Sequence, residues 1–113
     1  MGWIPFWAEM MDQGFDNEFY QGSGGITINR KPSEVLGENV FVTVLDDFTG
    51  FKLIASGIAP WLADLAMFSS DYPHSVCLWP NTQAVASKLT EGLTDEQITK
   101  IMSGTASRVY GLT

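Results

Sequence analysis

The sequence predicts an α/β fold in which about two parallel strands are covered by packing helices. Two short apolar runs predict strands: residues 65–68 have the length and apolarity of a strand buried on both faces, and residues 40–45 are rich in β-branched residues. A helical pattern over residues 49–56 separates them, and further helical patterns precede and follow. Because a helix usually connects parallel neighbours, this order indicates a βαβ unit. We expect the whole chain of 113 residues to form a single domain.

The first expected helix covers residues 3–13, with Pro5 in its first turn and Gly14 as its stop. Bulky apolar residues recur along it at helical spacing, which predicts a face turned to the core. In so short a chain, part of this face is also suited to a partner chain. The residues of this face are Trp3, Phe6, Trp7, Met10 and Met11.

Residues 21–32 are expected to form a flexible, glycine-rich loop. The run Gln-Gly-Ser-Gly-Gly at residues 21–25 lacks the Lys-Ser/Thr pair and the following helix of a phosphate-binding loop, which argues against that function. After the loop, residues 33–36 are expected to form one helical turn that Ser33 caps and Pro32 precedes.

Two adjacent carboxylates, Asp46 and Asp47, follow the run at residues 40–45. If the strands are parallel, both lie at the same edge of the sheet as the end of the second strand. Paired carboxylates there can share a metal or position a substrate. The alternative, which we favour, is that Asp47 caps the helix expected over residues 49–56.

Helical patterns fill the last third of the chain. Asn81 is expected to cap a helix that Gly92 ends. The segment Thr-Asp-Glu-Gln at residues 94–97 is a capping box, and apolar residues follow it at helical spacing. A last short helix is expected over residues 105–110. These helices supply packing residues and no chemistry.

The apolar run at residues 65–68 is followed closely by a carboxylate, Asp71, and by the single histidine of the chain, His74. Pro73 ends the strand because it cannot donate a ladder hydrogen bond. Asp71 is therefore expected at the carboxyl end of a buried strand, where α/β proteins build their sites. A carboxylate there can bind a metal or take a proton from a metal-bound water. The alternative is a plain turn or cap residue, which is common two positions before a proline.

The composition argues against several classes of partner. Six Lys and Arg residues against 13 Asp and Glu residues give a net charge of −7, so we expect no binding to nucleic acid or to anionic membranes. No apolar run approaches the roughly 20 residues of a membrane helix. The first part of the chain lacks the basic residues of a signal peptide, and the single cysteine, Cys77, fits a reducing compartment. The sequence therefore predicts a cytoplasmic protein.

Three short signatures resemble the C-terminal end of a known family. They are Phe-Ser-Ser-Asp-Tyr-Pro-His at residues 68–74, Trp-Pro-Asn at 79–81, and Gly-Thr-Ala-Ser-Arg-Val-Tyr-Gly-Leu at 104–112. In order and spacing they are similar to the amidohydrolase-related family, the metal-dependent (β/α)8-barrel group that includes the aminocarboxymuconate-semialdehyde decarboxylase-like enzymes. Residues 2–12 resemble the helix after barrel strand six, and residues 39–47 resemble strand seven.

This resemblance implies that the chain is a C-terminal fragment of a (β/α)8 barrel. A full barrel needs about 250 residues, whereas this chain has 113. Two strands cannot close a barrel, so the resemblance predicts completion by oligomerisation or by a missing N-terminal barrel portion. We accordingly expect residues 1–113 to form a single partial barrel domain.

The resemblance also implies a site. Asp71 matches the aspartate that follows barrel strand eight in the family, which binds the metal and moves a proton to or from metal-bound water. His74 and Trp79 would line the substrate mouth, and Arg108 matches an arginine expected in a structural ion pair. The expected cofactor is a divalent metal, zinc before others. The other family ligands are a His-x-His pair on strand one and a histidine after strand five, and they have no counterpart here.

Two functions follow from this comparison. The first is a truncated metal-dependent hydrolase or decarboxylase of small carboxylic acids, often aromatic or ring-cleavage acids. It would act only when another chain or a missing N-terminal portion supplies the histidines. The second is a non-catalytic, self-associating remnant or binding module. Whether the isolated chain is an enzyme is left open by the sequence.

Overall fold

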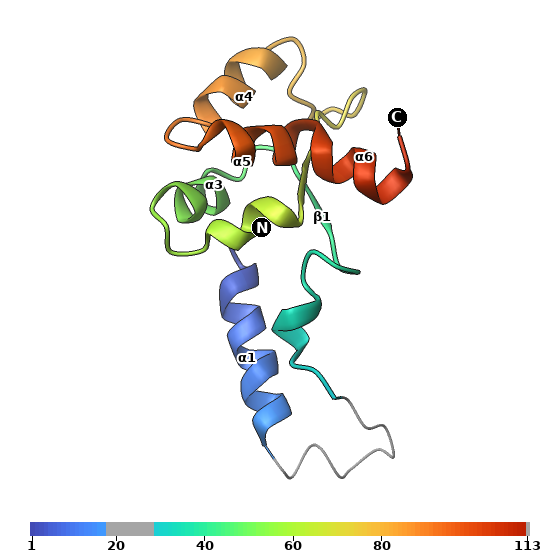
Figure 1. Ribbon diagram of the computed structural model, residues 1–113. Helices are drawn as coiled ribbons and strands as arrows, with labels where there is room; N and C mark the ends of the chain where they lie inside the picture. The colour runs from blue at the N-terminus through green and yellow to red at the C-terminus, as the bar shows by residue number, and fades with distance from the viewer. Residues whose placement is uncertain (18–28, 113) are drawn as a thin grey trace.

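The computed structural model describes residues 1–17 and 29–112. The loop predicted over residues 21–32 lies outside the described residues as far as residue 28. Figure 1 shows one helix, α1, standing out from a larger body that holds both strands and the C-terminal helices. The principal extents of the chain are 51 × 30 × 29 Å. In chain order the elements are α1 (Ile4–Asp16), η1 (Pro32–Val35), β1 (Val42–Val44), α3 (Phe48–Ala55), η2 (Pro60–Asp64), β2 (Ala66–Phe68), α4 (Thr82–Leu89), α5 (Asp95–Thr99), η3 (Lys100–Gly104) and α6 (Thr105–Tyr110).

Strands β1 and β2 pair in parallel, which confirms the predicted α/β order. Val42 lies opposite Ala66, and Val44 lies opposite Phe68. The helix between them, α3, and the 3-10 turn η2 form the connection. Both strands are three residues long, shorter than the apolar runs that predicted them. Their carboxyl ends lie at one edge of the sheet, so the residues after each strand emerge side by side.

The core lies where β2 meets the helices of the body. Five large side chains of this core are almost fully buried: Phe51 and Ile54 of α3, Leu62 of η2, Leu65 directly before β2, and Ile101 of η3. Removing each of these side chains from water contributes on the order of 1.5–3 kcal/mol of burial free energy. This cluster fixes β2 and therefore the start of the loop that carries Asp71.

The first turn of α3 confirms that Asp47 is a helix cap. Its Oδ1 accepts a hydrogen bond from the Gly50 backbone N–H at 2.8 Å. Its Oδ2 accepts the Gly2 backbone N–H at 2.8 Å and forms an ion pair with the Met1 ammonium. Burial alone would raise the pKa of Asp47, but these partners hold the pKa below its usual value. Asp47 therefore joins the start of the chain to α3.

Helix α1 differs from the prediction in its end and in its buried face. It continues through Gly14 to Asp16, because a helix interior tolerates glycine at a cost of about 1 kcal/mol. Its buried residues are Ile4 and Ala8, which meet the rest of the structure. Of the predicted core face, Met11 is half-buried. The other four residues, Trp3, Phe6, Trp7 and Met10, which we call the outer face of α1, have exposed fractions of 59%, 69%, 37% and 49%.

The turn η1 lies along α1 and is held there by polar contacts. Ser33 does not cap the turn as predicted; Lys31 occupies the cap position. Both Ser33 donors point instead to Asp12, with the hydroxyl 2.6 Å from Oδ2 and the backbone N–H 3.0 Å from Oδ1. The Ser33 hydroxyl lowers the pKa of the Asp12 carboxyl. A second contact joins Lys31 to Asp16 at 2.6 Å.

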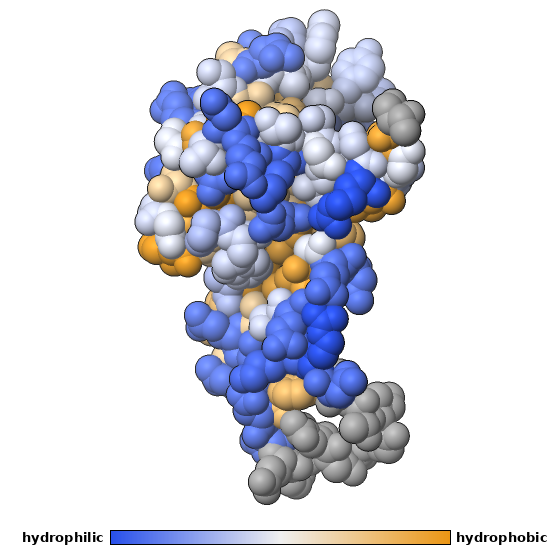
Figure 2. All heavy atoms as spheres, viewed as in Figure 1, coloured by the Kyte–Doolittle hydropathy of each residue, from blue (hydrophilic) through white to orange (hydrophobic). Residues whose placement is uncertain are grey.

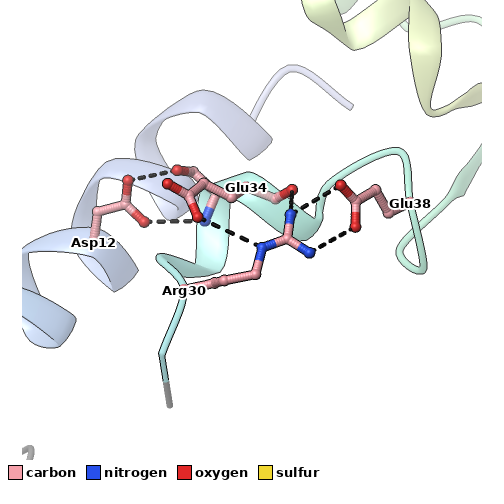
Figure 3. A network of polar contacts seen from close by, with 5 residues as sticks. Asp12, Arg30, Glu34 and Glu38 are labelled. Carbon is pink, nitrogen blue, oxygen red and sulfur yellow. Dashed lines mark hydrogen bonds and ion pairs between the residues drawn. The ribbon is translucent and has the colours of Figure 1, made fainter.

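Arg30 forms the other part of this network, shown in Figure 3. Its guanidinium donates to both carboxylate oxygens of Glu38 at 2.8 Å and to the Glu34 backbone carbonyl. This bidentate pairing raises the pKa of Arg30 and lowers that of Glu38. All of these groups are exposed, so the network orients η1 without adding much to stability.

The C-terminal helices follow the predicted order. Helix α4 begins directly after Asn81, although the Asn81 side chain makes no capping hydrogen bond. The capping box at α5 is confirmed, since Thr94 Oγ1 accepts the Gln97 N–H and Gln97 Oε1 accepts the Thr94 N–H. A π-helical turn, η3, joins α5 directly to α6, and Gly111 ends α6 with φ +63°. None of the described helices has the length and apolarity that crossing a membrane requires.

Candidate functional site

Asp71 lies three residues after β2, in a backbone conformation that few residues adopt. Its φ is +56°, which makes it the one described residue other than glycine with positive φ. Asp tolerates this left-handed region better than most residues, and such conformations concentrate at functional sites. The Ser69 hydroxyl accepts the Asp71 N–H at 3.3 Å, and the Ser70 hydroxyl accepts the Tyr72 N–H at 3.4 Å. The two serines that break the apolar run therefore hold the turn that presents Asp71.

The structure brings His74 onto the Asp71 carboxylate. Nδ1 of His74 lies 2.9 Å from Oδ1 of Asp71, and the His74 backbone N–H donates to the Asp71 carbonyl at 2.9 Å. The His74 side chain is 75% exposed and that of Asp71 is 36% exposed. Among the described residues, His74 contacts Oδ1 of this carboxylate, and no residue makes a hydrogen bond to Oδ2. Oδ2 of Asp71 and Nε2 of His74 take no part in this contact.

Trp79 lies in the same loop and contacts an aromatic residue that sequence reasoning missed. The rings of Tyr72 and Trp79 meet edge to face with centroids 6.3 Å apart. Both side chains are about two-thirds exposed. Such a pair contributes about 0.5–1.5 kcal/mol beyond burial. The available signal was that both aromatic residues directly precede a proline, Pro73 and Pro80, in the same short segment.

The neighbouring carboxylates of β1 do not join this site as a pair. Asp47 is turned into the cap of α3, as described above. Asp46 is exposed at the end of β1. The hypothesis of a shared Asp46–Asp47 site is therefore wrong, because the free N–H groups at the start of α3 and the Met1 ammonium bind Asp47.

Arg108 has a structural role, although not the one predicted. Its guanidinium donates to the backbone carbonyls of Gly37 at 3.2 Å and Asp64 at 3.1 Å, and it lies 5.0 Å from the ring centroid of Phe41. The contacts described for Arg108 are thus with carbonyls and a ring, in place of the expected ion pair with a carboxylate. They join the segments that precede β1 and β2, at the opposite end of the strands from Asp71.

The described residues do not by themselves fit a resident metal. Within residues 1–17 and 29–112, no three side chains of His, Cys, Asp or Glu come close enough together to hold an ion. Asp71 and His74 are two possible ligands, and a catalytic zinc normally takes three from protein. Nδ1 of His74 is moreover directed at the Asp71 carboxylate. The chemistry that the pair can perform alone is proton transfer at Oδ2 of Asp71, the carboxylate oxygen that His74 does not contact.

Comparison with known proteins decides the relationship. A family model for amidohydrolases matches residues 5–112, nearly the whole chain and all of the Asp71 loop. The chain belongs to the amidohydrolase family. Amidohydrolases commonly use divalent metals, and the family relationship indicates hydrolase-type chemistry. A search of curated proteins found no match to this amidohydrolase chain.

Proposed function

We propose that this chain is one part of a metal-dependent hydrolase or decarboxylase site, in which Asp71 is the catalytic carboxylate. The observation that carries the proposal is the placement of Asp71. It lies at the carboxyl end of a parallel strand, in a left-handed backbone conformation, with His74 bound to one oxygen. The family relationship supports the same assignment. By the resemblance of residues 68–74, the chain is of the aminocarboxymuconate-semialdehyde decarboxylase-like type and is the C-terminal portion of a barrel.

The proposed proton transfer uses residues of this chain alone. In hydrolysis, Oδ2 of Asp71 takes a proton from the attacking water while the water oxygen bonds to the substrate carbonyl carbon. The C–N or C–O bond then breaks, and Asp71 returns the proton to the leaving nitrogen or oxygen. His74 holds Oδ1 and so orients the carboxylate, and it also lines the substrate mouth with Trp79. The ring of Tyr72, which meets that of Trp79 edge to face, extends this substrate mouth.

The remaining groups come from outside this chain in the proposed function. Two possible ligands are described here, so the further ligands of a divalent metal, zinc first, would be supplied by a second copy or by a separate barrel portion. The proposed substrates are small carboxylic acids, aromatic or derived from ring cleavage, because these are the substrates that the resemblance implies.

A second candidate is a non-catalytic module that self-associates or binds a partner. Two observations favour it: the described residues hold no complete set of metal ligands, and the outer face of α1 is apolar and exposed. In this case the Asp71 loop is an inherited structural feature of the family.

A hydrolysis assay separates the two candidates. We would follow the release of 4-aminobenzoate from 4-acetamidobenzoate, an amide of an aromatic acid, with zinc added. Asp71→Asn is compared with Asp46→Asn, which changes an exposed carboxylate at the end of the neighbouring strand. The proposal predicts a zinc-dependent rate that Asp71→Asn lowers by about 10²-fold or more and that Asp46→Asn leaves unchanged. A zinc-dependent rate that Asp71→Asn leaves unchanged contradicts the catalytic role of Asp71, and a rate equal to that of buffer contradicts catalysis by this chain alone.

A further inference from the structure

The loop that presents Asp71 has little apolar packing to fix its shape. Residues 72–76 are all exposed. In Figure 1 the loop after β2, drawn in yellow, projects from the body, and Figure 2 shows mostly hydrophilic and neutral residues on the surface at this end of the molecule. The conformation of Asp71 therefore depends on the hydrogen bonds that reach it.

These hydrogen bonds hold Asp71 on both sides of its Cα. On the carboxyl side, its carbonyl accepts the His74 N–H at 2.9 Å, and its Oδ1 lies 2.9 Å from Nδ1 of the His74 ring. On the amino side, its N–H donates to Oγ of Ser69 at 3.3 Å. Among the described residues, Ser69 is the one acceptor for this N–H. Because φ is the rotation about the N–Cα bond and His74 holds the other groups of Asp71, the direction of the N–H sets φ.

Ser69 is itself tied to the sheet. Its backbone N–H donates to the carbonyl of Val44 in β1 at 2.8 Å, and Val44 is only 3% exposed. The Ser69 hydroxyl thus joins a fixed point of the sheet to the N–H of Asp71. The left-handed turn is in this way referred to the strands and not to the exposed loop.

Ser70 makes the same type of contact one position later and serves as a comparison. Its hydroxyl accepts the Tyr72 N–H at 3.4 Å, and its carbonyl accepts the Leu78 N–H at 3.0 Å. The contacts of Ser70 close the loop on itself, but none of them reaches Asp71. The two neighbouring hydroxyls therefore have separable roles.

The cost of the left-handed conformation and the strength of one hydrogen bond are similar in size. Holding a residue other than glycine at a φ such as the +56° of Asp71 disfavours the turn by a factor of about 5–30. One hydrogen bond offsets this by a factor of about 2–10. Without the Ser69 hydroxyl, Asp71 is expected to spend much of its time at negative φ, with its carboxylate turned elsewhere.

We propose that Ser69 is the positioning residue of this site: its hydroxyl holds Asp71 in the left-handed conformation and so fixes where the carboxylate oxygens point. The kinetic consequence rests on the proposed function of Asp71, whereas the conformational effect is measured without any activity. Since Ser69 acts through Asp71, its loss lowers kcat by about 3–10-fold and leaves KM unchanged.

Proton NMR of the whole chain tests the conformational effect. At positive φ the amide and α protons of one residue lie closer together than at negative φ, so Asp71 gives a strong intraresidue NOE in the wild type. Ser69→Ala weakens this NOE, and Ser70→Ala, which removes the neighbouring hydroxyl, leaves it unchanged. A weak NOE in the wild type, an undiminished NOE in Ser69→Ala, or an equal loss in Ser70→Ala overturns the proposal.

A second pair of variants separates the hydroxyl from the shape of the side chain. Threonine and valine have nearly the same shape, and both suit a position at the end of a strand, but only threonine keeps the hydroxyl. Ser69→Thr retains the strong NOE of Asp71, and Ser69→Val loses it as Ser69→Ala does. Equal NOEs in Ser69→Thr and Ser69→Val overturn the proposal, even where Ser69→Ala fails to fold.

The hydrolysis of 4-acetamidobenzoate gives the kinetic readout. Ser69→Ala lowers kcat with KM unchanged, and Ser69→Thr restores kcat. An NOE lost in Ser69→Ala while kcat stays at the wild-type value contradicts the positioning role. A wild-type rate equal to that of buffer counts against catalysis by this chain alone, and the NOE of Asp71 in the Ser69 variants then decides the role of Ser69.

Discussion

Asp47 connects three parts of the fold, and its removal has a calculable effect. Its carboxylate accepts the Gly50 N–H as a helix cap and also binds the Gly2 N–H and the Met1 ammonium. Loss of a helix cap costs about 1 kcal/mol. The charged contact to Met1, with the Asp47 side chain 23% exposed, adds about 1–2 kcal/mol. Asp47→Ala is therefore expected to lower the free energy of unfolding by about 2–3 kcal/mol.

Asp47→Asn separates the two contributions. Asparagine is as good a helix cap as aspartate but carries no charge, so this variant is expected to lose about 1 kcal/mol at pH 7. The matched control is Asp46→Asn, which changes the adjacent exposed carboxylate and is expected to shift the free energy by less than about 0.5 kcal/mol. Urea denaturation followed by circular dichroism measures all three variants.

The pH dependence gives a further check on the same group. The pKa of Asp47 is lower in the folded state than its ordinary value. Its charge therefore stabilises the fold fully above the unfolded pKa of about 3.9, and this stabilisation is lost as the pH falls toward the lower folded value. The difference between wild type and Asp47→Asn should shrink below about pH 4. A loss of less than about 0.5 kcal/mol for Asp47→Ala, or a difference that persists undiminished at pH 2, would refute this reasoning.

Three other substitutions test the fold. Ile101→Ala in η3, a position buried to 1% exposure, is expected to cost about 2–5 kcal/mol in urea denaturation; a cost below 1 kcal/mol would contradict the assigned core. Thr94→Ala removes the capping box and is expected to cost about 1 kcal/mol, whereas Thr94→Ser should cost little; equal losses would argue against capping. Arg108→Lys is expected to lower the thermal midpoint nearly as much as Arg108→Ala, because lysine lacks the planar fork that reaches two carbonyls; full retention by lysine would show that charge alone matters.

The parts of the fold that depend on local sequence were predictable. The apolar run identifies β2 because buried parallel strands carry few polar residues. β1, whose Thr43 is exposed, is identified by its β-branched residues. The caps at Asp47 and Thr94 follow from residue types that bind the free N–H groups of a first helical turn. The position of Asp71 at the end of β2 follows from the strand itself.

The parts that depend on long-range neighbours were not predictable. Periodicity shows that α1 has an apolar face, but which face is buried depends on what packs against it, and Ile4 and Ala8 meet the structure instead. Arg108 contacts Gly37, which lies 71 positions earlier in the sequence, and Asp64, which lies 44 positions earlier. No local pattern encodes contacts at this separation. The pairing of Tyr72 with Trp79 likewise depends on how the loop after β2 folds back.

The most direct test of the central claim is the metal content of the purified protein. Elemental analysis would use protein prepared without chelators or metal-binding tags, with Asp71→Asn and Asp46→Asn in parallel. The account predicts about one divalent metal, zinc first, per chain or per oligomer, lost in Asp71→Asn and retained in Asp46→Asn. Metal retained in full by Asp71→Asn would contradict the assignment of Asp71 to a metal-dependent site, and a folded wild-type sample without metal would contradict catalysis by this chain alone.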